Sequence, residues 1–118
     1  MKKRGGISRA ERVGQQIHQV VARLLLSGVD DPRLGEIEIT GVELSPDLRS
    51  GKIYFVMLNG GEPEPEVLEG VRRVTGFVRT HLGSELRLRY VPELEFKFDE
   101  AVLRGRRIDD ILSNLRED

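Results

Sequence analysis

The spacing of apolar residues switches repeatedly between helical and strand periods along this chain, and the order of the switches limits its fold. The predicted elements are, in order, a helix at 8–27, strands at 36–44 and 52–58, a helix at 65–82, a strand within 91–98 and a helix at 108–115. Three strands cannot bury both faces of their sheet, so the first two helices are expected to cover one face. The sequence therefore predicts an α+β layer.

Two local signals sharpen these elements. Ser8 and Glu11 have the S-x-x-E spacing of a capping box at the start of the first helix. In the first strand the apolar phase slips at Gly41, as a β-bulge would produce. Pro92 favours the beginning of the third strand or an edge position.

The chain of 118 residues is long enough for one hydrophobic core and is read as a single domain, 1–118. Residues 1–7 are expected to form a flexible basic arm, and residues 99–118 a C-terminal helical extension. There are no cysteines, which excludes disulfides and a thiol nucleophile. No apolar run approaches the length of about 20 residues that spans a bilayer, so a cytoplasmic protein without a membrane partner is expected.

The net charge of -1 conceals an uneven distribution. Residues 1–27 carry +5 and residues 71–91 carry +4, whereas residues 28–70 carry -7 and residues 92–118 carry -3. If the fold brings the two basic segments together, they form a surface that attracts polyanions. Arginine accounts for 15 of the 19 basic residues; its planar fork suits phosphate, although a genome-wide preference for arginine would explain the bias equally well.

Catalytic and metal-binding patterns are not found. His18 and His81 have no carboxylate beside them in the predicted pattern and are expected to be structural. The carboxylates of "EPEPE" at 62–66 are more simply a solvated loop than a metal site. No phosphate-binding loop or HExxH occurs, so no enzyme, metal or cofactor is expected. The predicted element order is close to that of a type II KH domain, but the GxxG loop with which ordinary KH domains clamp nucleic acid is missing.

The second helix contains Val74-Thr75-Gly76, three poor helix formers in a row. Glycine together with a threonine that bonds back to a preceding carbonyl predicts a helix that is bent, or split in two, near Gly76. The alternative is that Gly76 permits close packing on the first helix or the sheet. In either case a large residue at this position is expected to destabilise or redirect the helix.

Several segments resemble the bacterial ribosome-binding factor A family, which is KH-like and has a helix kink at Ala-x-Gly in place of GxxG. They are "RVGQQIHQVVARLL" at 12–25, "DDPRLGEIEITGVELSPDLRSGKIYFVML" at 30–58 and "GFVRTHLGSELRLRYVPELEFKFDEAVLRGRRIDDIL" at 76–112. Val74 stands where the family has alanine, and Gly76 is retained. The resemblance implies a KH-like type II domain that binds the free small (30S) ribosomal subunit. It also implies help in late maturation and 5′-end processing of 16S rRNA without catalysis, a role in cold growth, and release linked to other assembly factors including a GTPase.

The charge pattern and the resemblance together give a set of candidate RNA-binding residues. They are Lys2, Lys3, Arg4, Arg9, Arg12, Arg72, Arg73, Arg79, Arg87 and Arg89. Few aromatic residues are available for stacking, and Phe77 beside the kink is the one to watch. A monomer is expected. The main alternative is a protein–protein adaptor whose basic face meets an acidic partner, and a small nuclease or RNA-modifying enzyme is the least favoured reading.

Overall fold

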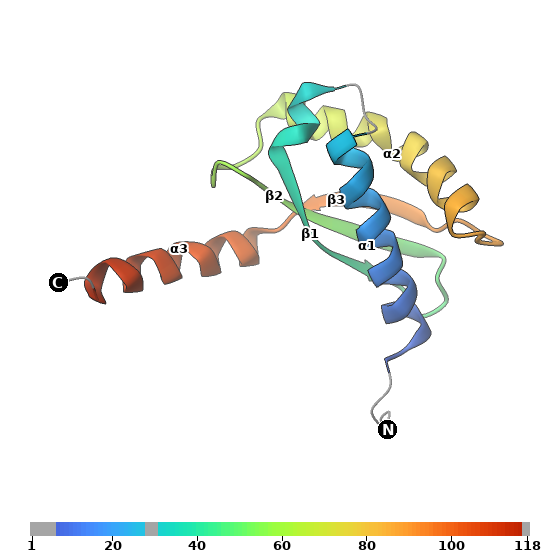
Figure 1. The fold of residues 1–118 in the computed structure, drawn as a ribbon, viewed down its shortest axis with the longest axis horizontal. Coiled ribbons are helices and arrows are strands. Elements are labelled where there is room, and N and C mark those ends of the chain that lie inside the picture. Colours follow the sequence, from blue (N-terminus) through green and yellow to red (C-terminus); the bar gives the residue numbers. More distant parts are fainter. Residues whose placement is uncertain (1–6, 28–30, 117–118) are drawn as a thin grey trace.

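The computed structural model describes residues 7–27 and 31–116 of the chain, and Figure 1 shows their arrangement. The elements are α1 (Arg9–Ser27), the 3₁₀ helix η1 (Pro32–Glu36), β1 (Ile37–Leu44), β2 (Ser50–Met57), α2 (Pro65–Glu85), β3 (Glu93–Phe98) and α3 (Glu100–Arg116). The predicted order of helices and strands is confirmed, and the short η1 is an addition to it. This is the expected α+β, KH-like type II arrangement.

The three strands form one mixed sheet in the order β1-β2-β3. β1 and β2 are antiparallel, as a short connecting turn predicts, and β2 and β3 are parallel. The register of β1 shifts between Ile39 and Gly41, which confirms the predicted bulge. β3 lies at an edge of the sheet, and Pro92, which has no amide N–H to donate, stands directly before its first residue.

The start of α1 is fixed by the predicted capping box. The Ser8 amide donates to Glu11 Oε1 over 3.0 Å, and the Glu11 amide donates to Ser8 Oγ over 3.1 Å. The apolar stripe of this helix is entirely buried and consists of Val13, Ile17, Val20, Val21, Leu24 and Leu25. Local sequence therefore sets both where α1 begins and which side it buries.

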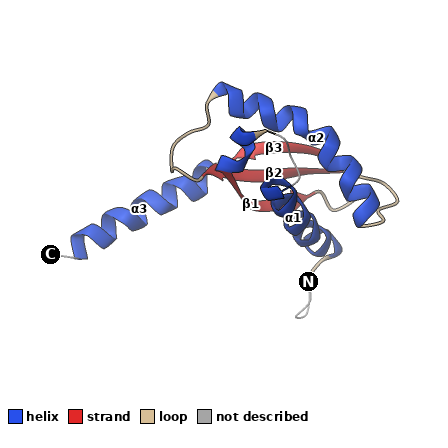
Figure 2. Ribbon diagram, turned by 45° about the horizontal axis from the view of Figure 1, so that its top comes forward, coloured by secondary structure: helices blue, strands red, loops and turns tan. Residues whose placement is uncertain are grey.

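Helices α1 and α2 lie on the same face of the sheet (Figure 2), as predicted. Their buried side chains form one core cluster with those of β1 and β2, including Ile53 and Phe55. α1 passes very close to β1, because a Cβ added at Gly14 would lie 3.0 Å from the carbonyl oxygen of Val42. Half-buried His18 is 3.1 Å from the carbonyl oxygen of Ile39, which confirms the structural role expected for it.

Helix α3 extends away from the sheet and its covering helices (Figure 1). Its first turn is held by Asp99, whose Oδ1 accepts from the Val102 amide over 3.1 Å and whose Oδ2 accepts from Thr40 Oγ1 over 2.7 Å. Leu103 is the buried residue of this helix. The apolar residues whose spacing predicts the helix are exposed, namely Ile108, Ile111, Leu112 and Leu115.

Candidate nucleic-acid interface

The middle of α2 carries Val74-Thr75-Gly76, where a bend or a break is predicted. The helix is continuous from Pro65 to Glu85, so the alternative of two separate helices is wrong. Thr75 Oγ1 donates to the main-chain carbonyl of Val71 over 2.9 Å, which is the back-bond that tends to tilt a helix axis. In Figures 1 and 2 the axis of α2 changes direction near its middle. That Thr75 and Gly76 cause this change remains our prediction.

Gly76 lies on the solvent side of α2. It is exposed, and a Cβ added there would meet no atom of another element within 4 Å. The alternative that Gly76 permits close packing on α1 or the sheet is therefore wrong, since α2 packs through the buried Val74 and Val78 instead. An added Cβ therefore has room at this position. The expectation that a large residue destabilises or redirects the helix stays a prediction.

The candidate arginines on the first half of α2 differ in how much they are already engaged. Arg72 is exposed. Arg73 is shared between two carboxylates, because its Nη2 lies 3.4 Å from Asp31 and its Nη1 lies 3.7 Å from Glu69. Arg72 is therefore better placed than Arg73 to meet a phosphate.

Arg79 is the candidate that the fold uses most. Its Nε donates to the carbonyl of Pro92 over 2.9 Å, and its Nη2 donates to the carbonyl of Val91 over 3.0 Å. The same Nη2 lies 3.5 Å from Glu93, and 33% of the side chain is exposed. This guanidinium thus ties α2 to the segment that leads into β3, a role that sequence reasoning did not assign to it.

The remaining candidates lie near the ends of helices. Arg9 and Arg12 are exposed on the first turns of α1, and Arg87 and Arg89 are exposed in the loop after α2. Arg87 has a φ of 53°, which is unusual for a non-glycine residue. Lys2, Lys3 and Arg4 lie outside the described residues.

The fold brings some of the candidate arginines to one surface hollow, whereas others contact different parts of the molecule. Arg9 and Arg89 line the same surface hollow, together with Arg49 from the turn between β1 and β2 and Tyr90 from the loop before β3. Arg73 instead contacts Asp31 beside η1. The sequence did not point to Arg49, because it stands inside the acidic block 28–70. The sequence singled out Phe77 and not Tyr90 as the aromatic residue to watch, although 75% of Tyr90 is exposed.

The two basic segments are also joined by a neutralising contact. Arg23 on α1 forms an ion pair with Glu85 on α2, and Glu85 lies 3.3 Å from His81 Nε2. The expectation that His81 has no carboxylate at helical spacing is wrong, since Glu85 is four residues further along the same helix. The hydrogen bond from Arg23 is the main reason why the pKa of Glu85 lies below its ordinary value.

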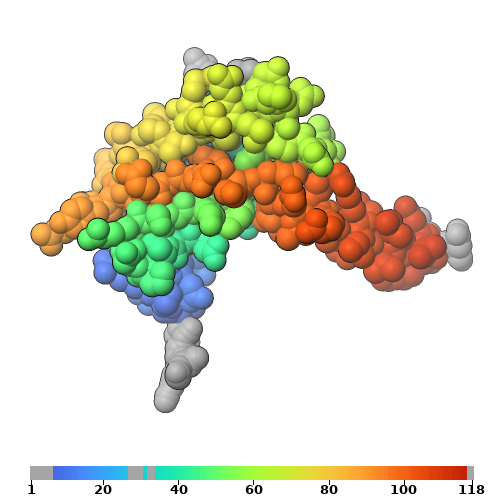
Figure 3. Space-filling model, turned by 180° about the vertical axis from the view of Figure 1, so that it is seen from behind, coloured from blue at the N-terminus to red at the C-terminus, as the bar shows by residue number. Residues whose placement is uncertain are grey.

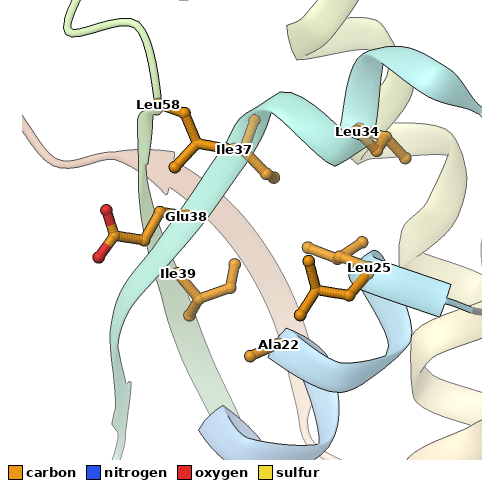
Figure 4. A pocket seen from close by; sticks show the side chains of 8 residues that line it. Ala22, Leu25, Leu34, Ile37, Glu38, Ile39 and Leu58 are labelled. Atoms are coloured by element: carbon orange, nitrogen blue, oxygen red, sulfur yellow. The ribbon is translucent and has the colours of Figure 1, made fainter.

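A second hollow, of about 180 Å³, lies between the end of α1 and β1 and is apolar (Figure 4). Ala22 and Leu25 face Ile39 across it, and Leu58 stands at its rim. Its charged lining residue, Glu38, is paired with Arg106 at 3.1 Å. This surface does not have the chemistry of a nucleic-acid site.

The described part of the chain has neither a candidate metal site nor a candidate membrane-spanning helix. Among residues 7–27 and 31–116, no three histidine or acidic side chains converge in a way that could hold a metal ion. Within the same residues no helix is both long and apolar enough to cross a membrane.

A family model described as ribosome-binding factor A matches residues 9–112. A protein of that name from Geobacter metallireducens is 41% identical over 107 residues, which cover 91% of each chain. One from Azoarcus sp. strain BH72 is 42% identical over 112 residues, covering 94% of this chain and 89% of the relative.

Solved structures show the same fold. The crystal structure of ribosome-binding factor A from Thermus thermophilus has a TM-score of 0.64 at 24% identity and covers 75% of this chain and 93% of that one. A homology model of the Thermus thermophilus protein, fitted into a cryo-electron microscopy map of a complex with the 30S subunit, has a TM-score of 0.65 at 24% identity. It covers 77% of this chain and 96% of that one.

Proposed function

The chain belongs to the ribosome-binding factor A family, and from this premise we propose that it binds the small ribosomal subunit as a non-catalytic assembly factor. The observation that carries the proposal is the family match over residues 9–112, which spans every helix and strand of the sheet layer. A relative with the same fold has been fitted into a map of a 30S complex. The chain would act in late maturation and 5′-end processing of 16S rRNA without cutting RNA itself.

We propose that contact with 16S rRNA rests mainly on phosphates and RNA shape. Five exposed candidates support this, because their guanidinium groups are at the surface where phosphate oxygens can reach them: Arg9 and Arg12 on α1, Arg72 on α2, and Arg87 and Arg89 in the loop after α2. Phe77, 46% exposed beside Gly76, is an aromatic surface close to the bend. The protein would act as a cytoplasmic monomer, and its release would depend on other assembly factors, including a GTPase.

Sedimentation with purified small subunits tests the proposal. The protein is expected to travel with the subunits at low salt, to leave them as salt rises, and to be released when the subunits are digested with ribonuclease beforehand. The rRNA should stay intact during incubation with the protein alone. Protein that remains at the top of the gradient at low salt would contradict the proposal. Binding that survives digestion would favour the adaptor reading, in which the basic face meets an acidic protein.

A further inference from the structure

Three segments that are distant in sequence enclose a hollow of about 770 Å³ at one end of the molecule. They are the start of α1, the turn between β1 and β2, and the loop between α2 and β3. Figure 3 shows the orange loop before β3 beside the green turn at the left edge, with the blue start of α1 below them. The volume lies within the range of small-molecule sites, about 300–1,000 Å³.

The frame of the hollow is held by main-chain and turn contacts. The amide of Glu93 donates to the carbonyl of Arg49 over 2.9 Å, which joins the turn to the start of β3. Within the turn, Asp47 Oδ1 accepts from Ser45 Oγ over 2.7 Å and from the Arg49 amide over 3.0 Å. Leu48, which stands between Asp47 and Arg49, has a φ of 63°. The turn is thus ordered without using the Arg49 guanidinium.

Three arginines of the hollow keep their guanidinium groups available. Among the described residues, Arg9, Arg49 and Arg89 form no ion pair and no side-chain hydrogen bond. The two carboxylates of the lining have other partners, since Asp47 is engaged in the turn and Glu93 faces Arg79 at 3.5 Å. The charge of Arg49 also helps to lower the pKa of Asp47, after the hydrogen bonds that this carboxylate accepts within the turn. The hollow therefore offers guanidinium groups outside hydrogen bonds and ion pairs, with the planar geometry that matches phosphate oxygens.

An aromatic ring stands among these cations. Tyr90 is 75% exposed, and the guanidinium carbon of Arg89 lies 5.6 Å from the centre of its ring. An exposed ring beside arginine is the combination on which unpaired bases stack. Bases inside a duplex are already stacked on one another and cannot reach such a ring.

We propose that this hollow binds one unpaired nucleotide of rRNA, with its base stacked on Tyr90 and its phosphate held by Arg9 and Arg49. Arg89 adds a second planar surface next to the base. The inference rests on the proposed function and adds to it a subsite for single-stranded RNA, at a position away from the bend of α2.

Tyrosine fluorescence can report on this subsite directly, because the chain has two tyrosines and no tryptophan. Tyr54 lies outside the hollow, and its hydroxyl donates to Glu43 over 3.2 Å. The variant Tyr54→Phe leaves Tyr90 as the tyrosine whose fluorescence is measured. A short single-stranded oligoadenylate is expected to quench the emission. Inorganic polyphosphate of matched charge and an RNA duplex of the same length should quench it little. Equal quenching by polyphosphate would overturn the stacking.

Affinity for the same oligoadenylate gives a second readout. Tyr90→Ala should weaken binding about tenfold, whereas Tyr90→Phe should retain it, because loss of stacking on one base costs roughly this much. Arg49→Ala should weaken binding and reduce its salt dependence. Arg104 is an exposed arginine on α3, so Arg104→Ala is the matched control, which should change neither the affinity nor its salt dependence. Unchanged affinity of Tyr90→Ala overturns the proposal.

Sedimentation with intact small subunits separates the two levels of inference. If the wild-type protein binds subunits but Tyr90→Ala binds oligoadenylate as the wild type does, the subsite is wrong and the proposed function stands. If the wild-type protein does not travel with subunits, the proposed function fails, whatever the oligonucleotide results show.

Discussion

Arg79 Nε on α2 donates a hydrogen bond to the carbonyl of Pro92 over 2.9 Å, thirteen residues further along the chain. A second bond, from Nη2 to the carbonyl of Val91, has a length of 3.0 Å. We expect Arg79→Lys to lower the free energy of unfolding by about 1–3 kcal/mol, because an ammonium group cannot reproduce the two-pronged contact. Urea denaturation measures this, with the exposed Arg72→Lys as a control that should unfold like the wild type.

The opposite pattern would assign Arg79 to RNA. Suppose that Arg79→Lys were as stable as the wild type, and that Arg79→Ala reduced the slope of log K for subunit binding against log salt concentration by about 0.7–0.9. The residue would then act chiefly on a phosphate. The structural role derived from its two carbonyl contacts would then be wrong.

Gly76 and Gly14 allow a matched comparison, because both are glycines within helices. Gly76→Ala should raise the free energy of unfolding by up to about 1 kcal/mol, since alanine favours the helix and the added methyl meets no other element. Gly14→Ala should lower it, because the new Cβ would lie 3.0 Å from the carbonyl oxygen of Val42. Thermal unfolding of the two variants checks both signs. A loss of stability in Gly76→Ala would mean that the bend itself is required for folding.

Glu85 is expected to contribute to stability in a pH-dependent way. Its pKa is lowered in the folded protein, chiefly by the hydrogen bond from Arg23 and further by His81. A lowered folded-state pKa means that the contribution is present above the unfolded-state pKa and is lost as the pH falls through the folded-state value. Glu85→Gln should therefore reduce the difference in melting temperature between neutral and acidic solution.

The effect of Glu85 should be small, because the side chains of Arg23 and Glu85 are 56% and 36% exposed. Glu95→Gln, a change at an exposed position on β3, serves as the control. Identical pH profiles for Glu85→Gln and the wild type would show that the ion pair does not contribute to stability in solution.

Helix α3 should divide into a stabilising first turn and a distal part on which the fold does not depend. Leu103 is 6% exposed, so Leu103→Ala should cost about 2–4 kcal/mol. Deleting residues 108–118 should leave the melting temperature nearly unchanged, because Ile108, Ile111 and Leu112 are 54%, 60% and 47% exposed. A large drop on deletion would indicate that the distal apolar residues are covered in solution.

The sequence by itself determined the order of helices and strands in this protein, apart from η1, and the side that α1 buries. The capping box of Ser8 and Glu11, the bulge at Gly41 and the buried stripe of α1 all follow from residues within a few positions of one another. Local spacing fixes such features, because helix and strand geometry decide which neighbours share a face. It also placed basic residues in two segments, from which all ten candidate RNA-binding residues were drawn.

Tertiary structure decided what those side chains contact. The sequence could not show that Arg79 bonds to Val91 and Pro92, because that contact depends on where the loop before β3 returns. Nor could it show that Arg49, from an acidic block, lies near Arg9 and Tyr90, or that the apolar side of α3 is exposed. These relations join segments that lie far apart in the chain. They are settled by the packing of the whole sheet layer and not by any local pattern.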